Sequence, residues 1–135
     1  MVKNSCKFII DPDLGERKIG IGTKDKNFWL EQLYNEHAKC EGGESRREVS
    51  KRMLSVVNKV LEKYKGYRIV LVSHAAAITF LLLNWCKLLD ASVENKKRKI
   101  SYKDKSIMDG SFNMPDGFRL EFIDNKISSI ERLKL

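Results

Sequence analysis

The amino-acid sequence predicts an α/β domain, and three features support this prediction. A short apolar run rich in β-branched residues spans residues 67–73 and is typical of a strand buried on both faces. The residues that follow, from Ala75 to about Leu88, are good helix formers without glycine or proline. A long amphipathic segment before the run and a hairpin pattern at the C-terminus supply a second core helix and further strands.

The first segment with a chemical pattern is a glycine-rich loop. Asp11-Pro12-Asp13 breaks the chain, and three glycines lie within residues 15–22. This spacing predicts an irregular loop whose backbone can approach a ligand closely. Glu16 and Arg17 lie in it, and such a pair can be a proton donor beside an anion clamp or two exposed charges.

A helix is predicted from Asn27 to about Lys39, where apolar and charged residues alternate at helical spacing. His37 falls on the same face as Trp29 and Leu33. We therefore expect His37 to be a partly buried helix residue without a catalytic role, because neither a strand end nor a glycine turn frames it.

The longest helix is predicted to begin near Glu44 or Ser45 and to end at about Tyr64, where Lys65-Gly66 is the expected stop signal. It should pack on one face of the sheet. Its apolar residues form one continuous stripe, made of Val49, Met53, Val56, Val57, Val60, Leu61 and Tyr64.

The C-terminal part is predicted to be loop followed by a hairpin. Residues 89–105 are polar and lysine-rich, with an exposed strand around Lys99 to Tyr102, and Lys96-Lys97-Arg98-Lys99 is interpreted as a solvated loop. Residues 117–123 and 126–133 flank Asp124-Asn125, a turn that closes hairpins, and this hairpin is expected at the edge of the sheet.

Composition restricts the class of protein. Twenty-six basic and eighteen acidic residues give a formal net charge of +8, which favours anionic partners, but no nucleic-acid motif accompanies it. Cys6, Cys40 and Cys86 lack metal-type spacing and indicate reduced thiols in a cytoplasmic protein. The sequence shows no signal peptide and no membrane span. At 135 residues, we expect a single domain over 1–135.

His74 occupies the junction between the predicted strand and the helix that follows it. Ligands of open α/β sheets bind at the carboxyl ends of strands, and the free N–H groups of a helix N-terminus favour an anion. His74 could thus face a bound anion, or it could be a buried histidine that binds a neighbouring carbonyl. Its position alone leaves both readings open.

Three signatures together point to a family. Val72-Ser73-His74 followed by Ala-Ala-Ala-Ile, and Gly43-Glu44-Ser45 before it, resemble the second half of the histidine phosphatase superfamily, the phosphoglycerate-mutase-like proteins. Val49 and Arg52 stand at the offsets of that pattern. Upstream, residues 14–20 look like the Leu-x-Glu-Arg-x-x-Gly segment of the family. The resemblance covers Leu14 to about Asn84.

The resemblance implies a three-layer α/β/α fold and a covalent mechanism that requires no metal or organic cofactor. In the family a first histidine attacks phosphorus, a second histidine and arginines hold the phosphoryl oxygens, and a glutamate protonates the leaving oxygen. By match, His74 is the second histidine and Glu16 the acid. Arg17 and Ala75 are expected to contact the phosphate, Ala75 standing where glycine is common.

The sequence departs from the family at the nucleophile. No Arg-His-Gly turn occurs, and the first strand and helix of the family have no counterpart before Leu14. A nucleophilic mechanism cannot turn over without its nucleophile. We therefore expect a truncated product, a polypeptide completed by another chain, or a rearranged remnant in which Phe8-Ile9-Ile10, a candidate strand, fills part of the gap.

The function predicted from these observations is that of a phosphomonoester hydrolase of the phosphoglycerate mutase family, inactive or incomplete as this chain alone, with phosphoglycerate mutation as the second possible reaction. Whether the chain is an enzyme stays open. The alternatives are a catalytically silent module that binds a phosphate ligand or a protein, and a basic nucleic-acid-binding domain. The expected partners are a phosphorylated small molecule and either a second copy of the chain or a complementing N-terminal fragment, with no membrane partner.

Overall fold

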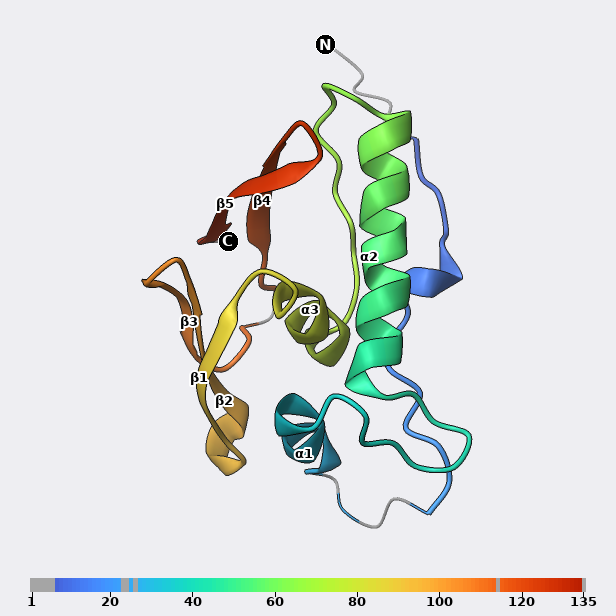
Figure 1. The fold of residues 1–135 in the computed structure, drawn as a ribbon, viewed down its shortest axis with the longest axis vertical. Coiled ribbons are helices and arrows are strands. Elements are labelled where there is room, and N and C mark those ends of the chain that lie inside the picture. Colours follow the sequence, from blue (N-terminus) through green and yellow to red (C-terminus); the bar gives the residue numbers. More distant parts are fainter. Residues whose placement is uncertain (1–6, 23–24, 26, 114, 135) are drawn as a thin grey trace.

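The computed structural model describes residues 7–22, 25, 27–113 and 115–134 of the 135-residue chain (Figure 1). These residues form a mixed α/β structure. No helix in this described part is both long and apolar enough to cross a bilayer. The elements, in chain order, are η1 (Pro12–Leu14), α1 (Phe28–Tyr34), α2 (Arg46–Lys63), α3 (Ala75–Leu82), β1 (Lys87–Ser92), η2 (Glu94–Lys96), β2 (Lys97–Tyr102), β3 (Lys105–Gly110), β4 (Phe118–Ile123) and β5 (Lys126–Arg132).

The long helix α2 is confirmed, and its first turn explains where it begins. The Ser45 hydroxyl accepts a hydrogen bond from the Glu48 N–H at 3.1 Å, and the Glu48 carboxylate accepts one from the Ser45 N–H at 2.8 Å. This capping box satisfies two N–H groups that a helix start leaves unbonded. The buried face of α2 carries Val49, Met53, Val56 and Val57, as the apolar stripe predicts.

Helix α3 packs against α2 in the main core, but it ends at Leu82 instead of continuing to Leu88. The Asn84 side chain donates hydrogen bonds to the Leu81 carbonyl and to the Ser50 hydroxyl, both at 2.8 Å. An amide that binds the last carbonyls of a helix competes with further helical hydrogen bonds, so the helix stops. The chain then enters β1 at Lys87.

The strands form two sheets. One has the antiparallel order β1-β2-β3, and the other is the hairpin β4-β5. The hairpin prediction is confirmed, with positive φ angles of 51° at Asp124 and 61° at Asn125, but the hairpin is a sheet of its own instead of the edge of a larger one. The strand expected around Lys99 to Tyr102 is present as part of β2, but it is buried instead of exposed, with Ile100 at 0% exposed. The loop expected on either side of it is wrong, because β1 and β3 pair with β2 there.

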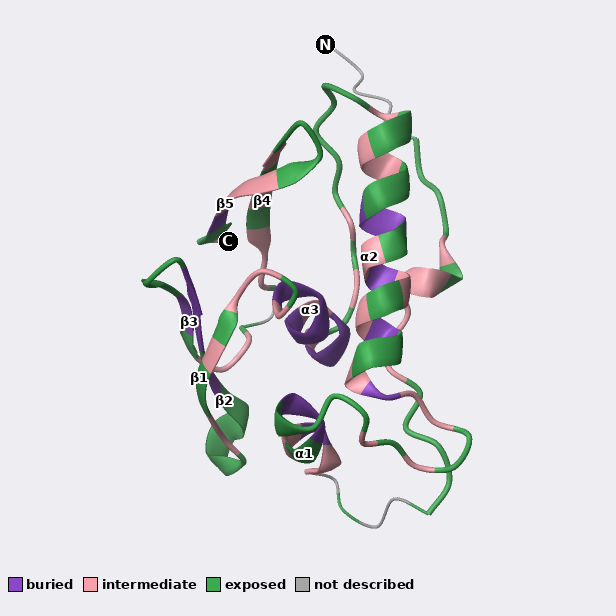
Figure 2. Cartoon of the chain, viewed as in Figure 1, coloured by how far each residue is buried: buried purple, intermediate pink, exposed green. Residues whose placement is uncertain are grey.

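The apolar run 67–73 differs most from its prediction. It is extended but belongs to neither sheet of the described chain, and it runs back alongside α2 as a coil (Figure 1). Tyr67, Val70 and Val72 are 77%, 86% and 76% exposed, and the segment is mostly exposed in Figure 2. The prediction of a strand buried on both faces is therefore wrong here, since a strand exists only through a partner's hydrogen bonds.

Residues 8–10 do not supply that partner. Phe8-Ile9-Ile10 forms no strand in the structure, and its side chains are 87%, 58% and 83% exposed. The suggestion that this run fills the gap is thus wrong for the described chain.

Of the cysteines, Cys6 lies outside the described residues. Burial raises the pKa of the Cys86 thiol to about 11, so this thiol is protonated near neutral pH.

Helix α1 is shorter than its apolar periodicity predicts and ends at Tyr34. The Asn35 side chain accepts a hydrogen bond from the His37 N–H at 3.1 Å and forms a local turn. His37 therefore lies in an exposed turn, with its imidazole 3.4 Å from the Glu36 carboxylate, and the prediction of a partly buried helix residue is wrong.

Candidate functional site

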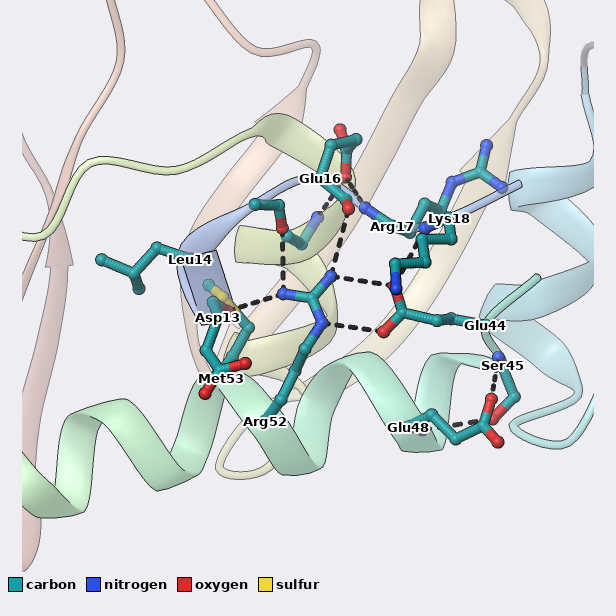
Figure 3. A network of polar contacts seen from close by, with 12 residues as sticks. Asp13, Leu14, Glu16, Arg17, Lys18, Glu44, Ser45, Glu48, Arg52 and Met53 are labelled. Atoms are coloured by element: carbon teal, nitrogen blue, oxygen red, sulfur yellow. Dashed lines mark hydrogen bonds and ion pairs between the residues drawn. The ribbon is translucent and has the colours of Figure 1, made fainter. Parts of the chain in front are cut away.

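The loop that carries Glu16 is held in place by Arg52 of α2 (Figure 3). The Arg52 guanidinium donates hydrogen bonds to three carbonyls of the loop backbone, those of Asp13 at 2.6 Å, Gly15 at 3.0 Å and Glu16 at 3.1 Å. Charged donors make hydrogen bonds stronger than neutral ones. The loop is therefore fixed to the long helix.

Glu44 completes this support. Its carboxylate accepts hydrogen bonds from Arg52 at 2.7 Å and from the Lys18 N–H at 3.0 Å, and its own N–H donates to the Lys18 carbonyl at 2.8 Å (Figure 3). Burial disfavours the charged carboxylate, but the bonds from Arg52 and Lys18 outweigh burial and lower the pKa of Glu44. Glu44 is thus an anion that joins the loop to α2.

Two glycines let the Glu16 loop approach the turn before α2. Gly20 has a φ angle of +87°, and a Cβ atom there would lie 2.6 Å from both the Glu41 carbonyl oxygen and the Gly43 nitrogen. A Cβ atom on Gly43 would collide with the Ile19 backbone. The close approach expected of this loop is therefore made to another backbone segment, and only glycine permits it.

The structure brings Glu16 and His74 to the start of the same helix. The Glu16 carboxylate accepts hydrogen bonds from the Ala77 N–H at 3.1 Å and from the Arg17 N–H at 2.9 Å. His74 is the N-cap residue of α3, and it is exposed. The Ser73 hydroxyl donates to the Leu14 carbonyl at 2.6 Å, which ties this junction to the loop. These two hydrogen bonds therefore join residues that lie 59 and 61 positions apart in the sequence.

The first N–H groups of α3 are available beside these side chains. Within the described chain, the hydrogen bonds of the first turn go from Ala77 to Glu16 and from Ile78 to the His74 carbonyl, and neither the Ala75 nor the Ala76 N–H donates to a described residue. Unbonded N–H groups at a helix N-terminus carry partial positive charge and favour an anion. We name the group of Glu16, His74 and Ala75 the helix-start site.

Arg17 extends the helix-start site towards α1. Its guanidinium donates a hydrogen bond to the Gln32 side chain at 2.9 Å, and Gln32, which is 1% exposed, donates in turn to the Ala38 and Glu44 carbonyls. Burial lowers the pKa of Arg17, while the Glu16 carboxylate raises it. Arg17 is thus a partly buried cation next to Glu16.

Arg98 is a residue that sequence reasoning missed. The basic run 96–99 was expected to be a solvated loop, but Arg98 lies on β2 and is only 5% exposed. The signal was the alternation of the strand, since Arg98 is in phase with Ile100 and both face inward. Its guanidinium lies 4.6 Å from the centre of the Trp29 ring and 5.2 Å from that of Phe112.

The chemistry of the helix-start site is that of an anion site with proton-transfer groups. It combines an exposed imidazole, free helix N–H groups and a neighbouring guanidinium, which are groups that hold phosphoryl oxygens. The Glu16 carboxylate beside them can accept or donate a proton. No group of three or more possible metal ligands occurs among the residues that the structure describes.

Comparison with known proteins gives the family. The sequence model of the histidine phosphatase superfamily (branch 1) matches residues 3–106. Two similar proteins, both named probable phosphoglycerate mutase GpmB, come from Escherichia fergusonii at 33% identity and from Cronobacter sakazakii at 34% identity, each over 87 residues. Each alignment covers 57% of this chain and 40% of the relative, so the chain spans well under half of these relatives. No solved structure matches.

The family match covers more than half of the chain and includes every residue of the helix-start site, so the chain belongs to the histidine phosphatase superfamily.

Proposed function

We propose that the chain carries the phosphate-binding and proton-donating part of a phosphomonoester hydrolase, built as one domain over residues 1–135. In this proposal His74 stabilises negative charge on the transferring phosphoryl group, and Arg17 and the Ala75 N–H bind its oxygens. Glu16 protonates the leaving oxygen. The observation that supports the proposal is the hydrogen bond of 3.1 Å between Glu16 and Ala77, which puts the carboxylate at the helix end where His74 lies.

Glu16 must carry a proton to act as an acid. A phosphoryl group bound at the helix start would bring negative charge close to the carboxylate, and like charges favour the protonated form of a carboxyl group. The protonated carboxyl group keeps an acceptor oxygen for the Ala77 N–H, and its O–H becomes a donor for the leaving oxygen. The ligand and the acid are in this way coupled through one helix turn.

The sequence lacks the nucleophilic histidine of the family. Its two histidines are His37 and His74, and no Arg-His-Gly occurs. His37 lies in the exposed turn after α1. We propose that the chain binds phosphate but does not turn over a phosphomonoester by itself, and that activity requires a polypeptide that carries the missing histidine.

Such a polypeptide would find an unpaired extended backbone at residues 67–73. The backbone between Arg68 and Val72 makes no hydrogen bond to the described residues, and the side chains of Val70 and Val72 point into solvent. An added strand and a helix over it would complete a three-layer α/β/α arrangement. A second copy of the chain could pair with the same backbone but would bring no nucleophile.

The alternative function is a catalytically silent module that binds a phosphate ligand or a protein at the same site. The missing nucleophile favours this alternative, because a helix-start site can bind an anion without one. Phosphoglycerate mutation is a second possible reaction of the completed protein, and the names of the two relatives support it.

The test measures inorganic phosphate binding and p-nitrophenyl phosphate hydrolysis by the full chain. We expect saturable phosphate binding, detected by ³¹P NMR line broadening, without turnover. His74→Ala should weaken binding by about 10-fold or more, the value of one charge-assisted contact, and the matched control His37→Ala should not. Turnover that depends on His74 would overturn the proposal that the chain is inactive alone. Absence of phosphate binding would overturn the function itself.

A further inference from the structure

Arg98 is a charged residue that the structure buries almost completely, at 5% exposed. No described carboxylate lies within 4.0 Å of its guanidinium. A buried cation normally has a carboxylate partner or a full set of hydrogen bonds, because transfer from water is costly. Arg98 has aromatic faces in place of a counter-ion.

The hydrogen bonds of Arg98 are also incomplete. One of its Nη atoms donates to the Lys96 carbonyl at 3.2 Å, while its buried Nε atom has no acceptor in the described structure. The ring nitrogen of Trp29 is likewise buried and without an acceptor. Because the Arg98 guanidinium stacks on the Trp29 ring at 4.6 Å, two unsatisfied N–H donors belong to one pair of side chains. Each donor left unsatisfied costs stability.

Arg98 and Arg17 converge on α1. Trp29, on which Arg98 stacks, lies one helical turn before Gln32, to which Arg17 donates its hydrogen bond. Burial lowers the pKa of Arg98, while the charge of Glu16 raises it and that of Arg17 lowers it. Arg98 and Arg17 therefore contact residues one turn apart on α1, although Arg98 comes from a strand that the site signatures do not include.

We propose that Arg98 and the Trp29 indole N–H form, together with Arg17, an anion subsite beside Glu16. Oxygen atoms of a phosphate ester would accept hydrogen bonds from donors that have no acceptor in the protein. The inference rests on the proposed function and deepens it, because it adds a second arginine to the ligand contacts. It also indicates a ligand with anionic oxygens on the side of Arg17 that faces α1.

A purely structural role is the competing explanation. In that case the Arg98 guanidinium only joins β2 to α1 through its aromatic contacts, a cation–π arrangement that needs no ligand. The two explanations differ in what a substitution changes. The structural role predicts lower stability with unchanged anion affinity, whereas the subsite predicts lower anion affinity.

The experiment uses the fluorescence of Trp29 in a Trp85→Phe background of the full chain, since Trp29 and Trp85 are the two tryptophans. Inorganic phosphate is titrated at constant ionic strength maintained with chloride. We expect a saturable change in emission. Arg98→Met, which keeps the length and apolar contacts of the side chain, should weaken phosphate about 10- to 100-fold. The matched control Lys99→Gln, which removes an exposed charge of the same strand, should leave the affinity unchanged.

Arg98→Lys keeps the charge but loses the planar arrangement of guanidinium donors. If Arg98→Met does not fold, Arg98→Lys replaces it in the titration. We expect Arg98→Lys to bind phosphate several-fold more weakly than wild type. Phosphate affinity that is unchanged in a folded Arg98 variant overturns the inference, even where His74→Ala abolishes binding and the proposed function stands. Conversely, binding that depends on Arg98 but not on His74 supports the subsite and overturns the role proposed for His74.

Discussion

The Arg52 guanidinium contacts the Glu44 carboxylate at 2.7 Å, and the same guanidinium binds the backbone that carries Glu16. One side chain of α2 thus connects the capped start of the long helix with the loop of the proposed acid. Both side chains are largely buried, at 19% and 15% exposed. The position of Glu16 therefore depends on residues that do not contact a ligand.

Arg52→Met should remove these bonds and leave Glu44 as a partly buried charge without its cation. We expect a loss of about 2–3 kcal/mol in the free energy of unfolding, below the value for a fully buried pair because some solvent reaches both groups. Urea denaturation followed by circular dichroism measures the loss. Arg47→Gln is the matched control, because Arg47 lies on the same helix with an exposed side chain. Equal stability of the two variants would contradict the supporting role of Arg52.

Glu44 and Asp116 predict how stability depends on pH. Burial opposes the charge of both carboxylates, but hydrogen bonds from Arg52 to Glu44 and from Arg132 to Asp116 outweigh it and lower each pKa in the folded state. A carboxylate with a lowered folded pKa stabilises the protein above its unfolded value, and this stabilisation is lost as the pH falls through the folded pKa.

We therefore expect the melting temperature to fall as the pH decreases below the ordinary values of 4.5 for Glu44 and 3.8 for Asp116. Glu44→Gln should flatten this dependence, measured by thermal unfolding between pH 3 and pH 7. Glu62→Gln serves as the control, since Glu62 is 70% exposed in a pair 3.6 Å from Lys65. A Glu44→Gln profile as steep as that of wild type would refute the assignment.

Gly20→Ala tests the close approach between the Glu16 loop and the turn before α2. A matched control is available in Gly66→Ala, because Gly20 and Gly66 have similar φ angles of +87° and +80° but only Gly20 has backbone atoms in the way. Gly66→Ala should cost about 1–2 kcal/mol for the left-handed backbone. Gly20→Ala should cost about 1–3 kcal/mol more, because the loop must move. Chemical denaturation compares the two, and similar losses would show that the contact is dispensable.

Several elements of the fold could be predicted from sequence because their signals are local. The junction at His74 follows from the change from an apolar run to helix formers, and Ser45 with Glu48 marks the start of α2. The turn at Asp124 and Asn125 follows from residues that tolerate positive φ. Each of these signals depends on a few neighbouring residues.

The rest could not be predicted because it depends on distant partners. Residues 67–73 have the composition of a buried strand, yet burial requires a neighbouring strand and a covering helix, which the described chain does not provide. Arg98 looked solvated because three lysines surround it, and only the register of β2 turns it inward. A local pattern contains neither kind of information.

The exposed run 67–73 should make the chain associate with itself. Val70 and Val72 are 86% and 76% exposed, and the backbone between Arg68 and Val72 has no hydrogen-bond partner in the described structure. An extended apolar segment with free N–H and carbonyl groups is a template for pairing with another strand. Lysine at both valine positions should oppose such pairing through charge repulsion between the added strands.

We therefore expect sedimentation velocity of the wild-type chain to show an average mass that rises with protein concentration, and the Val70→Lys, Val72→Lys double variant to remain monomeric over the same range. Val93→Lys, a substitution at a 46% exposed valine of another segment, controls for the added charge and should associate like wild type. If Val93→Lys suppresses association equally, net charge governs it and the run 67–73 is not the contact. If the wild-type chain is monomeric throughout, its free strand edge does not pair with a second copy, and the edge is open to a different polypeptide.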